Sequence, residues 1–387
     1  MKHLVRNTCI LLALIFGAMA CDGLKEQPSE PITLEEATAY GKEWEARIVA
    51  EGIYAFSGEF DFDRMIDRIL DDMGFSINND AIRKALRDAL PSELNEVFQG
   101  VLDAGGLSFR KAIVEDGEVR VLFSLVSEEQ LNYYEFLLHK KEGDINMQDL
   151  YIYITGEYLS RTFADIYKST LRKNGLMKVA DDHKTKAVER LAEIFDLADV
   201  QGYEVAMEEM EALKPELKNL KAYWLNMITL SEESGDLELY GRTIDEFRVY
   251  FPDDPSLALR MLNYSQVKED HQLMRETAAN LIRRVGKDKD LLGYIAYSYE
   301  LEEDNAAGLK FMNSTLEDFP DDETLLNYHM GFAVAEKEYA QALTSMETLC
   351  KLYEYTPDNT YWKLIMPELF ASKEYNDWLS KQDLQNE

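Results

Sequence analysis

Side chains that can exchange protons are concentrated in one part of the sequence, between positions 133 and 153. The candidates for a catalytic site there are His139, Asp149, Tyr133, Tyr151 and Tyr153. If this segment forms strands, the alternation of side chains brings several of them to one face of a sheet. Catalysis also needs a base oriented by a third group, or a metal held by about three ligands, and the spacing requires neither. We therefore predict no catalytic residue, no cofactor and no enzyme activity.

Two further polar features have structural explanations. His139 stands beside Lys140 and Lys141 near a strand end, so we expect a solvated hairpin residue. A run of carboxylates begins at residues 59–63, but it lacks the Gly that a calcium loop places at its sixth position. Helix capping and a solvated helix face explain this acidic run, and no metal site is predicted.

The elements that would position these side chains follow from the periodicity of apolar residues. Alternation predicts four strands, at 107–115, 118–126, 131–140 and 145–154. Their short connections indicate an antiparallel sheet. Helical spacing predicts helices at 34–53, 62–73, 80–104 and 156–173. Thr33 and Glu36 are expected to form a capping box before the first helix, and Pro91 to break or kink the third.

The order of these elements, helices and then a curved antiparallel sheet, resembles the nuclear-transport-factor-2-like (NTF2-like) and cystatin-like α+β folds over residues 33–175. The resemblance implies a sheet that curls over a helix and can leave a pocket. Some members use that pocket for ligands and a few for catalysis. A small-molecule or peptide-binding protein is therefore the alternative function, and an NTF2-like enzyme is a third.

The second half of the chain repeats a short motif. Phe-Pro-Asp-Asp occurs at 251–254 and at 319–322, and the copies are 68 residues apart, which is twice 34. A frame of 34-residue units that begin at Lys221, Pro255, Lys289 and Glu323 puts both prolines at position 32. Position 24 of these units is apolar throughout, with Ile244, Ala278, Met312 and Met346. Recurring apolar positions of this kind are typical of the buried faces of stacked helices.

This pattern resembles the tetratricopeptide repeat (TPR) family, in which each unit is a pair of antiparallel helices. The resemblance implies a helical solenoid over residues 185–387. It also implies a capping helix near 360–381 that contains Tyr361 and Trp362. The predicted fold is thus an α+β domain followed by an all-α region.

In this family the first helices of successive units line a concave groove. The partner-binding residues that the resemblance implies are Leu225, Asn226, Thr229, Leu259, Asn263, Tyr294, Tyr297 and Asn327. Lys and Arg, which clamp acidic tails in some members, are absent at these positions. The expected partner is an envelope protein or a neutral or basic extended peptide. The same residues could instead serve only to pack one unit against the next.

The first twenty residues have the character of an export signal. Lys2 and Arg6 precede an apolar run at 10–16, and small residues lead to Cys21. The sequence around Cys21 resembles a bacterial lipobox, which implies lipidation of this Cys and a membrane anchor. Ordinary signal cleavage, which would leave Cys21 free, is the alternative. Residues 1–20 are thus the predicted signal peptide, and residues 21–32 the tether.

Charge limits the classes of partner. Asp and Glu number 73 against 41 Lys and Arg, for a formal charge of −32. Such a field repels phosphate backbones, so nucleic acid is not expected as a partner. We predict an acidic envelope lipoprotein of a bacterium, anchored to the inner or outer membrane and facing the periplasm or the cell surface. Its predicted role is that of an adaptor or scaffold.

Overall fold

The computed structural model describes residues 30–56, 58–74, 80–125, 131–173, 183–252, 254–353, 355–356 and 359–383. The predicted signal peptide, Cys21 and nearly all of the tether lie outside the described residues. The chain divides into two compact units, the first ending at Arg260 and the second beginning at Met261. The first unit therefore contains the α+β part together with the first helices of the helical region.

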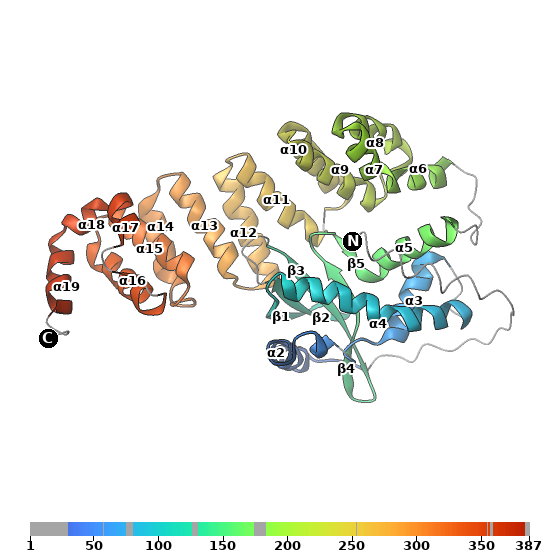
Figure 1. Cartoon of the computed structure of the whole chain (residues 1–387), viewed down its shortest axis with the longest axis horizontal. Helices are drawn as coiled ribbons and strands as arrows, with labels where there is room; N and C mark the ends of the chain where they lie inside the picture. Colours follow the sequence, from blue (N-terminus) through green and yellow to red (C-terminus); the bar gives the residue numbers. More distant parts are fainter. Residues whose placement is uncertain are drawn as a thin grey trace. The chain divides into compact units, whose positions relative to one another are not determined.

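The predicted fold class is confirmed: helices come first, an antiparallel sheet follows, and the remainder is helical (Figure 1). The first elements are α2 (Leu34–Glu51), the short 3-10 helix η2 (Gly52–Phe56), α3 (Phe62–Met73) and α4 (Asp80–Asp103). The capping box is present, because the Thr33 hydroxyl accepts from the Glu36 amide and the Glu36 carboxylate accepts from the Thr33 amide. Of the predicted break or kink at Pro91, the break is wrong, since α4 continues through this exposed residue.

The sheet contains five strands in the described part of the chain, one more than predicted. They are β1 (Leu107–Glu115), β2 (Glu118–Leu125), β3 (Tyr133–Lys141), β4 (Asp144–Ile152) and β5 (Glu157–Tyr158). All neighbours are antiparallel, and their order in space is their order in sequence. Helix α5 (Leu159–Lys173) starts directly after β5, which consists of only two residues. A strand this short shows no alternation, so periodicity could not reveal it.

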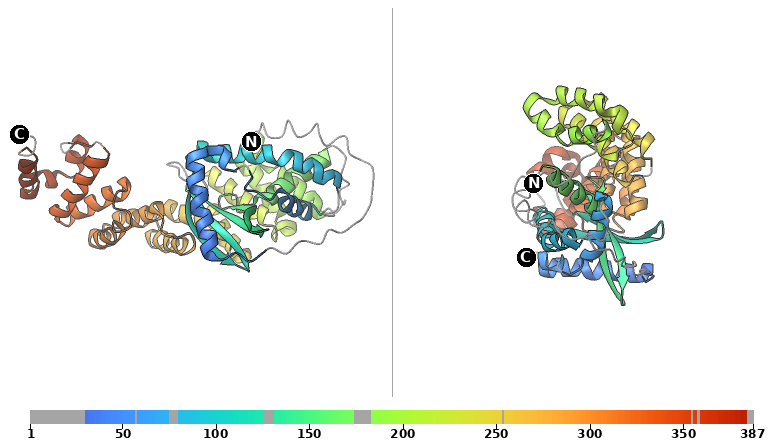
Figure 2. Two further views of the ribbon diagram at one scale, coloured as in Figure 1. Left: turned by 90° about the horizontal axis from the view of Figure 1, so that it is seen from below. Right: turned by 90° about the vertical axis from the view of Figure 1, so that its right-hand side faces the viewer.

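Strand register separates an apolar face from a polar one. On one face, Val121 lies opposite Phe136, and Phe136 lies opposite Leu150. These three side chains are fully buried, and α2 packs against β1 and β2 (Figure 2). The Trp44 ring of α2 meets the Phe136 ring edge-on, with 4.8 Å between centroids. This aromatic core uses one face of the sheet. The polar side chains lie on the opposite face.

The helical region keeps the predicted spacing. The first helices of the four units are α9 (Lys221–Ser234), α11 (Pro255–Val267), α13 (Lys289–Leu301) and α15 (Glu323–Ala335). The second helices are α10 (Leu237–Tyr250), α12 (His271–Val285), α14 (Asn305–Thr315) and α16 (Tyr339–Leu352). Both sets begin at intervals of 34 residues, and each first helix begins where the frame placed the start of a unit.

The helices that precede and follow these four repeat units are less regular. Helix α8 (Tyr203–Leu217) keeps the spacing, but the segment before it is divided into α6 (His183–Ala192) and α7 (Ile194–Gln201). The expected single capping helix is wrong. Three short helices stand in its place, namely α17 (Thr360–Ile365), α18 (Pro367–Ala371) and α19 (Lys373–Asp383). Trp362 is buried in the apolar core of the second unit, whereas Tyr361 is 65% exposed.

The repeated acidic residues act as caps. Asp322 accepts a hydrogen bond from the Leu325 amide at the start of α15, and Asp254 accepts one from the Ser256 amide at the start of α11. Each also pairs with the Lys that begins the preceding unit: Lys221 with Asp254, and Lys289 with Asp322. The duplicated motif therefore ends two of the four repeat units, each with a cap and an ion pair.

Candidate functional site

The second unit contains a groove on the helical surface, with a volume of about 850 Å³. Its lining comes from successive helices, beginning with α13 and ending with α18. Six of the lining residues are aromatic: Tyr328, Phe332, Tyr339, Tyr355, Tyr361 and Trp362. We call this feature the aromatic groove. Aromatic walls with a few polar groups are typical of sites that bind peptides or small molecules.

The charged side chains of the aromatic groove are Glu300, Lys337 and Glu368. Burial raises the pKa of Glu300 above its ordinary value. Asn327 and Asn359, which also line the groove, are held by the backbone: Asn327 donates to the Glu323 carbonyl, and Asn359 accepts from the amides at the start of α17. Two acidic groups against one basic group give the groove a slight preference for cations.

Four of the predicted partner-binding residues belong to the first compact unit, which ends at Arg260, and all four are buried or partly buried. Leu225 and Leu259 are buried. A Cβ at Gly156, in the turn between β4 and β5, would lie 3.1 Å from a methyl carbon of Leu225. The α+β part of the same chain therefore packs on the surface that the repeat pattern assigns to a partner. Asn226 is partly buried, and so is Thr229, whose hydroxyl donates to the Leu225 carbonyl of its own helix.

In the second unit, Asn263 is exposed, and Tyr294 and Tyr297 are partly buried. Of the eight predicted residues, Asn327 is the one that lines the aromatic groove. Sequence reasoning missed Tyr355, and it assigned Tyr361 and Trp362 to a cap. The frequency of aromatic residues after position 352 was the signal that could have pointed to them.

A second hollow, of about 640 Å³, lies in the first unit on the polar face of the sheet. We call it the polar cleft. Cross-strand pairing aligns Glu135 with Tyr151 and Tyr151 with Tyr158 on this face. The charged residues of its lining are Arg68, Asp72, Glu115, Asp116, Arg120, Glu135, Glu157, Arg161, Lys221 and Asp254. Most of these charges are already neutralised by one another.

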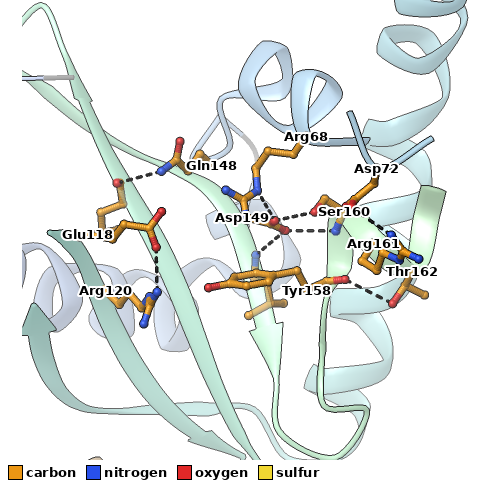
Figure 3. A network of polar contacts seen from close by, with 12 residues as sticks. Arg68, Asp72, Glu118, Arg120, Gln148, Asp149, Tyr158, Ser160, Arg161 and Thr162 are labelled. Carbon is orange, nitrogen blue, oxygen red and sulfur yellow. Dashed lines mark hydrogen bonds and ion pairs between the residues drawn. The ribbon is translucent and has the colours of Figure 1, made fainter. Parts of the chain in front are cut away.

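The centre of the network in Figure 3 is Asp149 of β4, which is fully buried. Its carboxylate accepts from Arg68 Nε at 2.6 Å, from the Ser160 hydroxyl at 2.6 Å, and from the amides of Ser160 and Leu150. Burial raises the pKa of Asp149, and the Arg68 guanidinium together with these donors opposes that shift. A buried carboxylate with this many donors has a fixed orientation, and it fixes the orientation of the side chains that bond to it.

Arg68 is the side chain that Asp149 anchors. Its guanidinium also lies over the Tyr158 ring, 4.9 Å from the centroid, and the side chain is 33% exposed. Within the described residues its two terminal nitrogens have no hydrogen-bond partner. The cleft thus presents a guanidinium that is fixed at Nε and open at its tip.

Arg120 and Glu135 are two buried side chains that line the polar cleft. Arg120 pairs with Glu115 and Glu118, and its Nε has no partner among the described residues. Glu135 accepts from the Tyr153 hydroxyl at 2.5 Å. These contacts make the wall of the polar cleft stiff and highly polar.

The sequence candidates for catalysis do not form one site. The register places Tyr133, Asp149 and Tyr151 on the polar face, and the Tyr153 ring contacts the rings of Tyr133 and Tyr151. Their polar contacts differ. Tyr151 donates to Asp254 at 3.0 Å and Asp149 bonds to Arg68, so neither activates the other. Among the described residues, no cluster of three or more His, Cys, Asp and Glu side chains could hold a metal ion.

The prediction for His139 is wrong, because this residue is buried. Residues 59–61 run beside β4, with the Met147 amide donating to the Glu59 carbonyl and the Asp61 amide donating to the Met147 carbonyl. Asp61 thereby comes within 3.9 Å of His139 Nε2. Burial lowers the pKa of His139, and the charge of Asp61 opposes this shift. As expected for the acidic run, Asp61 caps α3 by accepting from the Arg64 amide.

No known protein family matches the chain, and neither does any curated protein sequence. In the part of the chain that the structure describes, none of the helices combines the length and the apolar character needed to cross a bilayer.

Proposed function

We propose that this protein is an exported, lipid-anchored adaptor that binds an extended peptide segment of a protein partner in the aromatic groove. The observation that carries the proposal is the groove itself, in which aromatic side chains from successive helices face a volume of about 850 Å³. Aromatic rings bind a peptide with little loss of conformational freedom, and side-chain amides can bond to its backbone.

The charge of the groove selects the partner. Glu300 and Glu368 outnumber Lys337, and the chain as a whole has a formal charge of −32. A basic peptide is attracted by this field, a neutral one is not opposed by it, and an acidic one is repelled. Asn327, the predicted contact that lines the groove, supplies a side-chain amide for such a peptide.

Support for the anchor comes from the sequence of the first 21 residues, where a basic start, an apolar run and small residues precede Cys21. Acyl chains on this Cys would contribute about 0.8 kcal/mol per buried methylene to membrane binding. Mass spectrometry of the mature N-terminus tests the anchor. A mature chain that begins at an unmodified Cys21, or that retains residues 1–20, would rule it out.

The adaptor role is tested by photo-cross-linking in intact envelopes from a probe introduced at Thr324, which lines the groove and is exposed. The wild type is compared with an Asn327→Ala, Tyr361→Ala double variant. Leu352→Ala is the matched control, because Leu352 is exposed in the same unit and does not line the groove. We expect the double variant to lose partners that the control retains. An unchanged set of partners would refute the role of the groove.

A further inference from the structure

The polar cleft has features that an adaptor role does not require. Four cations and six carboxylates line it, and nearly all of them have a partner within the chain. Arg120 pairs with Glu115, Arg161 with Asp72, and Lys221 with Asp254. Pairing of this kind removes most of the charge of the cleft. The side chains that remain uncommitted are therefore the informative ones.

Arg68 is ion-paired with Asp149 through Nε alone, so the tip of its guanidinium stays open. Asp149 holds its Nε, and the Tyr158 ring supports the plane of the guanidinium, so the side chain is oriented before any ligand arrives. Its terminal nitrogens have no partner within the described residues. A planar pair of N–H donors matches the two oxygens of a carboxylate. The Tyr158 hydroxyl, which lines the same cleft, is a further donor without a hydrogen-bond partner among the described residues.

Glu157 is a partly buried carboxylate that makes no ion pair with the other described side chains of the cleft. It lines the cleft and has no hydrogen bond or ion pair in the described part of the chain. Burial, followed by the charge of Asp165, raises the pKa of Glu157. The charges of Arg161 and Lys221 oppose this shift without a direct ion pair to Glu157, and an ammonium group in contact with the carboxylate would oppose it further.

We propose that the polar cleft binds a small zwitterion, with the carboxylate of the ligand on Arg68 and its ammonium group on Glu157. A volume of about 640 Å³ fits a free amino acid or a molecule of similar size. A phosphate or another multiply charged anion is disfavoured, because Asp72, Asp116 and Glu135 line the same space. This site is independent of the aromatic groove, which belongs to the other compact unit.

The probes are free α-amino acids with small, apolar and aromatic side chains, tested on the full mature chain by calorimetry and thermal shift. Each is compared with its amide, which lacks the carboxylate, and with the matching acid that lacks the amine. Inorganic phosphate is the anion control. We expect binding of at least one free amino acid and about tenfold or weaker binding of its amide and its des-amino acid.

Three variants and a control connect binding to the cleft. Glu157→Gln removes a negative charge and Tyr158→Phe removes a hydroxyl, and neither group has a hydrogen-bond or ion-pair partner among the described residues, so folding is preserved. Both are expected to weaken binding about tenfold, and Arg68→Lys is expected to do so through loss of the planar donor pair. Arg87→Gln is the control, because Arg87 pairs with Asp63 and does not line the cleft.

The outcomes separate clearly. Preference for the zwitterion together with loss of binding in Glu157→Gln supports the proposal. If the acid that lacks the amine binds as tightly as the free amino acid, Glu157 does not recognise an ammonium group, and the proposal is overturned. Binding of phosphate in competition with the amino acid would show an anion site instead, and no binding by any probe at millimolar concentration also overturns the proposal.

Discussion

Replacement of Asp149 by Ala is expected to destabilise the first unit strongly. The substitution leaves the Ser160 hydroxyl, the Ser160 amide and the Leu150 amide without their acceptor in a buried position. It also leaves the Arg68 guanidinium without its anion. A buried donor that loses its acceptor costs about 1–3 kcal/mol, and removal of one member of a buried ion pair costs about 3–5 kcal/mol. These contributions are not additive, since all four groups share one carboxylate, and Arg68 is one-third exposed and can regain water. We therefore expect a loss of about 3–4 kcal/mol in the free energy of unfolding, near the low end of these values.

Urea unfolding followed by fluorine NMR on fluorotryptophan-labelled protein measures this loss for each unit. Trp44 reports the core of the first unit, and Trp362 reports that of the second. With a typical m value, the midpoint seen by Trp44 should fall by roughly 1–2 M, and that of Trp362 should stay unchanged. Asp63→Ala is the control, because Asp63 is itself exposed, and its pairs with Arg87 and, at 3.9 Å, with Arg83 contribute at most about 1 kcal/mol each. Equal shifts for Asp149→Ala and Asp63→Ala would refute the reasoning.

Two other predictions concern the first helix and the helical region. Hydrogen bonding by Lys140, and then by the Thr33 amide, lowers the pKa of Glu36 from 4.5 to about 2. As pH falls, the unfolded chain takes up this proton first, so the stability contributed by Glu36 is complete above about pH 4.5 and is lost towards pH 2. Glu36→Gln should therefore flatten the acid limb of a denaturation curve measured against pH, and an unaltered limb would contradict this assignment. In the second unit, a Cβ at Gly308 would lie 2.7 Å from the Phe332 ring, whereas none of the described atoms comes within 4 Å of a Cβ at Gly293. Gly308→Ala should destabilise by about 1–3 kcal/mol and Gly293→Ala should stabilise by up to about 1 kcal/mol. Thermal unfolding distinguishes the two, and the same sign for both would show that ring packing does not control the first.

Local signals carried most of what the sequence predicted. Asp254 and Asp322, which mark the units, cap helices that start within a few residues of them, and the helices begin where the 34-residue frame put them. The same is true of the capping box at Thr33 and of the alternation in β1, which covers the predicted range. Each of these features depends on neighbours in sequence, so a single chain without relatives is enough to find it.

Long-range contacts account for what the sequence did not predict. His139 is buried because residues 59–61 lie beside β4, and nothing near His139 in the sequence announces this. The Arg68 and Asp149 side chains that meet in the polar cleft are separated by 81 positions. Leu225 is covered because the turn at Gly156 packs against it. Repeat periodicity identifies which side chains face the concave side of a helix pair, but it cannot tell whether another part of the chain already lies there.

The fixed interval between caps also determines how such a chain can change in length. Asp288 accepts from the Asp290 amide at the start of α13, as Asp322 does from the Leu325 amide at the start of α15. Loss of residues 289–322 would join Asp288 directly to Glu323, and one cap would take the place of the other. Duplication of the same segment would add a helix pair with its cap already present. Gain or loss of one segment can therefore alter the number of side chains offered to a partner, while every remaining helix keeps its start.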